Sequence, residues 1–358
     1  MSNTRESPRL YASSITTKPK VAPAPWDISA KADAILRTRD HVDFYVRKAV
    51  LSVASDVFEG MFSLPELPDN RKRKQPDNEE YLDGIPIVEL QEDSSTITTL
   101  LQYCYPMPKP KHFDPRKLCN SLYAARKYMM EYAESELITR FESQVGATPY
   151  QFYLLASKFG WQREAKIAAE VSLLHEFKPE FMPPLLEEVS ALVLSRLLKY
   201  RESCIDAALN EVGHERKTIW FPPDLLSVEY KFPWLKYASL RDWVFFKCQN
   251  MRTPIAIVVA QMPSRSDSTT VLVPYWWVLY MEEVKKDVQA YPRKFTKVYK
   301  PEYLEKYTAA GASNCAGTCC ADRLPNDLLL FHESLISRVD QALKKVPFMS
   351  SETSTGKA

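Results

Sequence analysis

The most constraining feature of the sequence is a change of hydrophobic period within residues 32–62. Apolar residues at 34–36 suit a strand, residues 38–41 suit a tight loop, and residues 42–46 alternate apolar with polar side chains, as in a half-buried strand. From Lys48 onward, apolar residues recur every three or four positions, as in an amphipathic helix. The stretch therefore predicts a β-hairpin followed by two short helices, the second capped near Ser55 and Asp56.

The following residues extend this pattern into a domain. Residues 85–90 predict a third strand, and apolar periodicity predicts helices near residues 94–105, 118–129 and 132–145. Residues 65–84 are charged and contain proline, which is typical of a mobile loop. We expect an α+β domain over residues 26–147, in which a small sheet is flanked by helices.

Three stretches carry a family resemblance: ADAILRTRDHVDFYVRKAVLSVASDVFEGMFSLP, DGIPIVELQEDSSTITTLLQYCYP and AARKYMMEYAESEL. In these stretches, residues 33–130 resemble a BTB/POZ domain, and more closely the BTB proteins of mushroom-forming fungi. The resemblance covers about a third of the chain. It implies a BTB/POZ fold whose early strands and first helices build an oligomerisation face.

The resemblance also assigns roles to individual residues. The Asp of the first strand matches Asp33, and the base that opens the first helix matches Lys48; Arg47 stands where relatives usually have His. The resemblance implies that Asp33 and Lys48 lie near each other at or beneath the dimer face. Independently of the family, a buried carboxylate needs a cation beside it. The alternative, that they only stabilise the monomer, stays open. The full set of expected interaction residues is Asp33, Lys48, Val50, Leu51, Ala54, Phe58, Leu101 and Tyr105.

The rest of the chain is predicted to be mainly helical. We expect a disordered tail over residues 1–25, a helical extension over 148–212, an aromatic-rich and mostly helical region over 213–347, and a second disordered tail over 348–358. Within these regions, apolar periodicity predicts long helices near residues 189–212, 276–290 and 326–345. Their apolar stripes are expected to form a core rather than a ligand site.

A cysteine cluster is the sharpest candidate for site chemistry. Cys315, Cys319 and Cys320 lie close in sequence, and the fold could add Cys248 and His332. Thiolates and imidazoles are the ligands of structural zinc, but adjacent cysteines rarely ligate one ion together, so the spacing is a weak signal. We expect unligated thiols and no cofactor; a zinc site and a redox-labile pair are the alternatives.

A basic run and the absence of catalytic motifs bound the function further. Arg71, Lys72, Arg73 and Lys74 form a possible nuclear import signal, although acidic neighbours weaken its field and favour a solvated loop. The net charge of +2 does not favour nucleic acid as a partner. The sequence contains no GxSxG, HExxH, GxGxxG or GxxxxGK[ST] motif, so we expect no enzyme.

These observations predict a non-enzymatic protein-interaction module that forms homodimers or binds another protein. The alternatives are a substrate receptor for a cullin-type ubiquitin ligase, with a cullin as partner, and a BTB-containing transcriptional regulator. Seven scattered cysteines and an N-terminus without a long apolar stretch predict an intracellular protein, in the cytoplasm or the nucleus. No apolar run approaches the roughly 20 residues that cross a bilayer, so no membrane contact is expected.

Overall fold

The computed structural model describes residues 19–63, 81–177, 183–212, 214–217, 228–236, 243–248, 255–261, 268–293, 301–317 and 319–348. The chain divides into two compact units, Met1–Gln144 and Val145–Ala358. Each unit has its own hydrophobic core and is described separately.

The N-terminal unit contains a five-stranded sheet with the strand order β1-β3-β2-β5-β4. Strands β2 (Ala34–Arg37) and β3 (Val42–Val46) form the predicted antiparallel hairpin, and His41 in its turn has a φ of 57°. Strand β5 (Ile85–Glu89) lies parallel to β2, and β4 (Tyr81–Leu82) pairs with β5. The sheet is therefore assembled around the hairpin that the change of period predicts.

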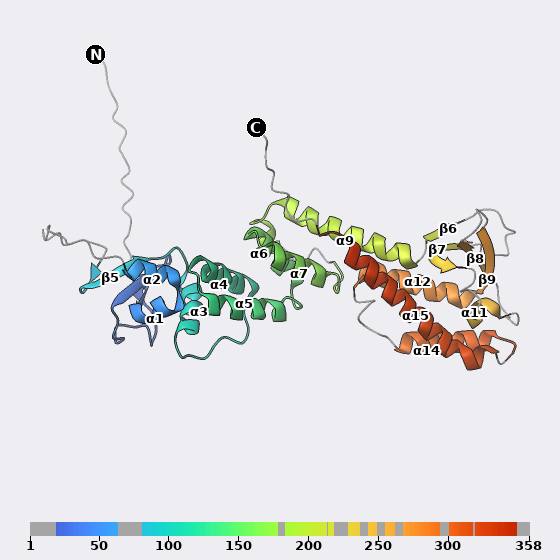
Figure 1. The fold of residues 1–358 in the computed structure, drawn as a ribbon, viewed down its shortest axis with the longest axis horizontal. Helices are drawn as coiled ribbons and strands as arrows, with labels where there is room; N and C mark the ends of the chain where they lie inside the picture. The colour runs from blue at the N-terminus through green and yellow to red at the C-terminus, as the bar shows by residue number, and fades with distance from the viewer. Residues whose placement is uncertain are drawn as a thin grey trace, which may run out of the picture. The chain divides into compact units, whose positions relative to one another are not determined.

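In the part of this unit that the structure describes, helices complete the fold (Figure 1). They are α1 (Lys48–Ala54), α2 (Asp56–Ser63), α3 (Ser94–Cys104), α4 (Pro115–Lys127) and α5 (Glu131–Gln144). Side chains cap two of them: Asp93 accepts a hydrogen bond from the Thr96 amide at 2.8 Å, and Asp114 accepts one from the Arg116 amide at 2.9 Å. Each cap satisfies an amide that the helix itself cannot pair, which fixes where the helix begins.

The described structure extends into both segments that were expected to be terminal tails. Residues Lys20–Val21 form β1, which pairs in parallel with β3, and Ala22 is buried. At the other end, the Phe348 ring makes edge contacts with the rings of Tyr153 and Tyr200. The described residues of these segments are held in place because they complete a sheet or pack against aromatic rings. Residues 64–80, most of the expected mobile loop, lie outside the described residues.

The C-terminal unit begins with helices. These are α6 (Pro149–Lys158), α7 (Gln162–Ser172), the short α8 (Pro183–Leu186) and the long α9 (Ala191–Val212). The buried Arg201 on α9 donates hydrogen bonds to the carbonyl oxygens of Ser172 and His175, where α7 ends. A guanidinium placed on unpaired carbonyl groups both caps α7 and fastens it to α9.

A four-stranded sheet follows, with the order β6-β7-β8-β9. Its strands are β6 (His214–Lys217), β7 (Val228–Lys236), β8 (Ile255–Gln261) and β9 (Ser268–Pro274). Strand β8 is parallel to β7 and antiparallel to β9. The sequence analysis did not predict this sheet, although the region as a whole is mainly helical as expected.

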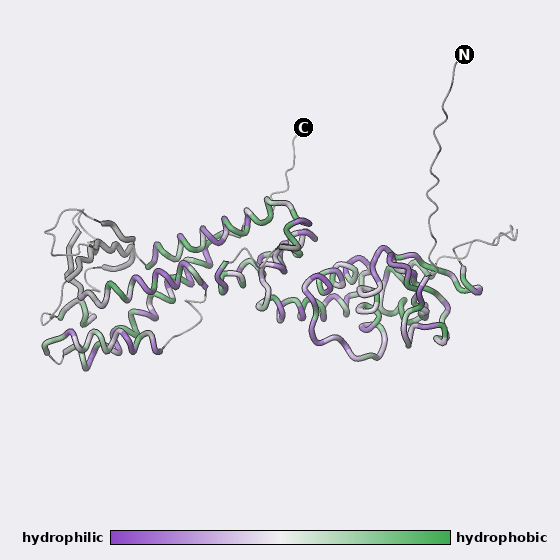
Figure 2. The backbone as a smooth tube through the Cα atoms, turned by 180° about the vertical axis from the view of Figure 1, so that it is seen from behind, coloured by the Kyte–Doolittle hydropathy of each residue, from purple (hydrophilic) through white to green (hydrophobic). Residues whose placement is uncertain are grey.

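Among the described residues, further helices surround the core of this unit: α11 (Val244–Lys247), α12 (Tyr275–Ala290), α14 (Pro301–Asn314) and α15 (Cys319–Lys345). Apolar and polar residues alternate along the long helices (Figure 2), and α9 packs against α12 and α15. Phe331 on α15 contacts the rings of Trp243, Phe245, Trp277 and Tyr280, with centroid distances of 5.5–6.3 Å. The aromatic residues therefore form the core that the sequence predicts.

Candidate functional site

Asp33 acts as a helix cap rather than as a buried ion-pair partner. Its side chain is exposed, and its Oδ1 accepts a hydrogen bond from the backbone amide of Lys48 at 2.6 Å. The Lys48 ammonium instead lies 5.7 Å from the ring centroid of Phe62. Asp33 thus satisfies one of the unpaired amides at the start of α1 and joins that helix to β2.

The buried carboxylate of this unit is Asp43, which the sequence analysis did not single out. Asp43 is 2% exposed, and Arg37 on the neighbouring strand binds both of its oxygens, at 2.7 Å through Nε and 2.9 Å through Nη2. Arg37 and Asp43 are direct partners in the β2–β3 register. The physical requirement of a cation beside a buried Asp is therefore met, but by a different pair. The signal available in the sequence was the position of the two residues on opposite arms of the predicted hairpin.

Helices α1 and α2 each expose some apolar side chains and bury others. Leu51 is 1% exposed and Phe58 2% exposed, so both lie in the core. Val53, by contrast, is 92% exposed. We define the α1–α2 face as five accessible apolar residues of these helices: Val50, Val53, Ala54, Val57 and Met61.

The helical period explains this division. Val50, Val53 and Ala54 are three and four residues apart and therefore share one side of α1, whereas Leu51 points away from that side. On α2, Val57 and Met61 are four residues apart in the same way. The α1–α2 face thus includes two expected interaction residues, Val50 and Ala54, and three that the sequence analysis missed.

Ser55 sets the break between the two helices. Its hydroxyl donates to the carbonyl oxygen of Tyr128 and accepts a hydrogen bond from the Phe58 amide at 3.1 Å. The Phe58 ring stacks on the Tyr128 ring with a centroid distance of 4.9 Å. These contacts hold the start of α2 against the end of α4, as predicted for a capping residue at this position.

Leu101 and Tyr105, on and just after α3, have internal roles. Leu101 is 2% exposed. Tyr105 is partly exposed, its hydroxyl accepts a hydrogen bond from the Arg47 amide at 3.1 Å, and its ring lies edge-on to Trp26. Changes at either position would therefore perturb the domain itself before they altered a partner contact.

The comparison with known families agrees with this geometry. Residues 28–144 match the BTB/POZ domain family. The N-terminal unit is a BTB/POZ domain. The match covers the hairpin, the α1–α2 face and helices α1 to α5. No curated protein matches the chain, so the expected closeness to fungal BTB proteins stays a prediction.

The BTB/POZ domain exposes a second set of large side chains, on and between α4 and α5. Tyr123, Met129 and Tyr132 are 47–56% exposed. Met129 has a φ of 51°, and the backbone there turns from α4 into α5. The Lys109 ammonium lies over the Tyr132 ring at 4.3 Å from its centroid, which leaves part of the ring accessible. These residues were not among the expected interaction residues.

The remaining predicted site residues are placed as follows. The basic run Arg71, Lys72, Arg73 and Lys74 lies outside the described residues. The thiols of Cys315 and Cys320 lie together with that of Cys248, whereas the side chain of Cys319 is outside the described residues. His332 is not part of this group: its Nδ1 shares a hydrogen bond of 2.8 Å with the Tyr280 hydroxyl.

Two groups near these positions have shifted pKa values. Burial lowers the pKa of His332 from 6.5 to about 4, so the imidazole is neutral at pH 7. Burial, together with the neighbouring thiols, raises the pKa of Cys320 far above its ordinary value.

Among the described helices, none is long and apolar enough to cross a bilayer.

Proposed function

We propose that the BTB/POZ domain joins this chain to a second polypeptide through the α1–α2 face, and that the first partner is another copy of the chain. A BTB/POZ domain is a protein-interaction module. The observation that carries the proposal is the 92% exposure of Val53, with four further accessible apolar residues on the same two helices.

The energetics favour covering this face. Burial of an apolar side chain such as valine contributes about 1.5–3 kcal/mol relative to full exposure. A specific interface needs about 800 Å² per partner, which is more than five side chains supply. Val21 and Ile28 in the same unit are 47% and 72% exposed and offer further apolar area. Leu51 and Phe58 support the face from beneath without touching the partner.

The ends of both helices make this surface rigid. Asp33 holds the start of α1, and Ser55 holds the start of α2. A surface that is already ordered before association loses little conformational entropy when it binds. The C-terminal unit, which is built around its own aromatic core, would carry a second binding function.

The test measures the mass of the full-length chain by light scattering across a dilution series. We expect the wild-type chain to dimerise reversibly and Val53→Lys to remain monomeric, because each interface would then contain two like charges without partners. Leu330→Lys is the matched control, since Leu330 on α15 is also apolar, helical and 47% exposed. A wild-type chain that stays monomeric at the highest concentration, or a Val53→Lys chain that still dimerises, contradicts the proposal.

A cullin-type ligase receptor is the second candidate. The helix pair α6 and α7 follows the BTB/POZ domain in sequence, and the two helices pack closely on each other. The exposed Tyr123, Met129 and Tyr132 would give a cullin an apolar surface on and between α4 and α5, made of residues other than those of the α1–α2 face.

A binding assay with a purified cullin separates the two candidates. The receptor proposal expects capture by the wild-type chain and by Val53→Lys, and loss of capture with Tyr123→Ala combined with Tyr132→Ala. Absence of binding by the wild-type chain would refute the receptor role while leaving the dimer proposal to its own test.

A further inference from the structure

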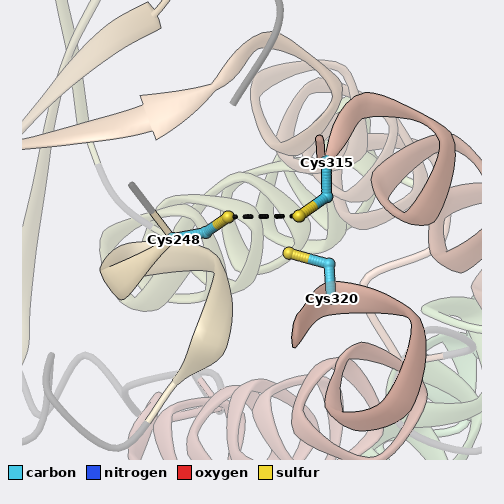
Figure 3. A group of neighbouring side chains, drawn as sticks. All are labelled: Cys248, Cys315 and Cys320. Carbon is cyan, nitrogen blue, oxygen red and sulfur yellow. Dashed lines mark hydrogen bonds between the residues drawn. The ribbon is translucent and has the colours of Figure 1, made fainter. Parts of the chain in front are cut away.

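Three cysteine thiols converge in the C-terminal unit from separate parts of the chain (Figure 3). Cys248 directly follows α11, Cys315 directly follows α14, and Cys320 lies in the first turn of α15. The Sγ atoms of Cys248 and Cys315 are 3.5 Å apart, and all three Sγ atoms lie within 4.8 Å of one another. Figure 3 shows the three side chains pointing toward a common centre.

The position of Cys248 is fixed by its contact with α15. The amide of Val244, at the start of α11, donates a hydrogen bond of 2.7 Å to Oδ2 of the buried Asp327. The amide of Cys248 then closes the single turn of α11 by donating to the Val244 carbonyl oxygen at 2.9 Å. Cys248 is thereby held beside the helix that carries Cys320.

The position of Cys315 depends on a close approach of α14 to its neighbours. A Cβ atom at Gly311 would lie 2.2 Å from Cδ2 of Leu324 and 3.0 Å from the Trp276 ring, so the packing leaves no space for a side chain there. Cys315 follows one helical turn later. Glycine at 311 therefore lets the end of α14 come near enough to α15 for Cys315 and Cys320 to meet.

The sulfur positions match those of a tetrahedral metal site. Zinc binds thiolates at about 2.3 Å, so two sulfurs in a tetrahedral site lie about 3.8 Å apart. The spacings here, 3.5 Å for one pair and at most 4.8 Å for the others, bracket that value. A divalent ion at the centre would need the Cys248–Cys315 pair to widen by about 0.3 Å, with only small shifts of the other sulfurs.

Backbone amides near two of the sulfurs would partly offset the negative charge of metal-bound thiolates. The Gly317 amide donates a hydrogen bond of 3.4 Å to Sγ of Cys315. Cys320 is the second residue of a 27-residue helix, where unpaired amides stabilise negative charge. The three thiols become negatively charged only when a metal ion or a base displaces their protons. Both features would then stabilise that charge.

We propose that Cys248, Cys315 and Cys320 bind a structural Zn²⁺ ion. Binding releases three protons to solvent and forms three zinc–sulfur bonds, which leaves the site with a net charge of −1. A water molecule supplies the fourth ligand. The ion links α11, α14 and α15, three elements that are otherwise joined through apolar packing and the Val244–Asp327 hydrogen bond.

A disulfide between Cys248 and Cys315 is the competing chemistry for the same residues. It would require the two sulfurs to close from 3.5 Å to about 2.05 Å and an oxidant to accept two electrons. It would also leave Cys320 out of the bond, although the structure brings that thiol to the same place. The convergence of three sulfurs rather than two favours the metal.

The experiment uses the full-length chain purified under reducing conditions without chelator. Elemental analysis of the wild-type chain should give close to one equivalent of zinc per chain. After zinc removal, titration with Co²⁺ should produce intense sulfur-to-metal charge-transfer absorption and the visible bands of tetrahedral cobalt. The cobalt spectrum reports on the wild-type chain, so it remains decisive even if a cysteine variant folds poorly.

Single serine substitutions locate the site. Each of the variants Cys248→Ser, Cys315→Ser and Cys320→Ser should hold less than about a tenth of the wild-type zinc. Loss of a group that only hydrogen-bonds to a metal ligand already weakens binding by about tenfold to a hundredfold, and loss of the ligand itself should cost more. Cys104→Ser, in the BTB/POZ domain, is the control and should keep the full zinc content.

Two results would overturn the proposal. One is a reduced wild-type chain that contains no zinc and gives no charge-transfer band with Co²⁺. The other is retention of zinc by all three serine variants, which would place the ion elsewhere. Detection of a Cys248–Cys315 disulfide by mass spectrometry in a metal-free, non-reduced chain would assign the cluster to redox chemistry instead.

Discussion

The two units of the chain differ in which side chains they bury and which they expose. The BTB/POZ domain pairs its buried carboxylate, Asp43, with Arg37 and leaves apolar side chains such as Val53 on its surface. The C-terminal unit buries its aromatic groups around Phe331 and gathers three thiols inside. An exposed apolar face indicates binding of a partner, whereas inward-facing reactive groups indicate internal stabilisation. We therefore propose a partner-binding role for the BTB/POZ domain and an internal metal site for the C-terminal unit.

The largest effect should come from removing the centre of the aromatic core. Phe331→Ala should lower the free energy of unfolding of the C-terminal unit by about 3–5 kcal/mol, because a fully buried ring is lost and a cavity remains. Urea denaturation followed by tryptophan fluorescence reports this unit, since six of the seven tryptophans lie in it. The adjacent Leu330→Ala, at a 47% exposed position, should cost less than about 1 kcal/mol. Equal costs for both variants would show that Phe331 does not organise the core.

The buried ion pair should have the next largest effect, and in the other unit. Asp43→Ala should destabilise the BTB/POZ domain by about 3 kcal/mol, because Arg37 would keep its charge without a partner. Asp33→Ala removes only a helix cap and should cost about 1 kcal/mol. Hydrogen exchange measured by mass spectrometry separates the two units. If Asp33→Ala lowered the free energy of unfolding more than Asp43→Ala did, Asp33 would have the ion-pairing role expected from the sequence.

Acid should weaken the C-terminal unit more than the BTB/POZ domain through His332. Its pKa is about 4 in the folded chain and 6.5 when unfolded, so below pH 6.5 the unfolded state binds a proton that the folded state does not. Stability is therefore lost as the pH falls through this window, by about 2 kcal/mol between pH 7 and pH 5. His332→Gln should reduce this dependence. An unchanged pH profile in the variant would assign the acid sensitivity to other groups.

The smallest effect on stability should come from the exposed residue with the proposed binding role. Val53→Lys should change the free energy of unfolding by less than about 0.5 kcal/mol, because the side chain makes few contacts within the monomer. Chemical denaturation at high dilution, where a dimer would be dissociated, gives this value. A loss of several kcal/mol would mean that Val53 stabilises the domain itself, and the two units would then differ less than proposed.

Local patterns predicted much of the BTB/POZ domain. The change of period at Lys48 marked the passage from hairpin to helices, and the helices begin and end near their expected residues. The stripe on α15 was also correct: Leu328, Phe331, Leu335 and Val339 are all fully buried. These features depend on the helical and strand periods, which are written in adjacent residues.

The remaining features depend on contacts between distant residues. Strand β8 is a short apolar run, which alone does not distinguish a buried strand from a helix, and it pairs in parallel with β7 across an intervening segment. Cys248 and Cys315 meet across 67 positions of sequence. Which side of α1 faces outward also follows from the packing of Leu51 rather than from the composition of the helix. Such arrangements need a three-dimensional structure.

Gly311 makes the C-terminal unit sensitive to a single methyl group. Alanine at this position would act as a wedge between α14 and α15, because its Cβ would overlap Leu324 and press on Trp276. Related sequences that share this fold should therefore keep glycine at 311 or, where they lose it, carry a smaller residue at 324. An alignment of relatives in which positions 311 and 324 change together would show that the contact between α14 and α15 is kept across the family.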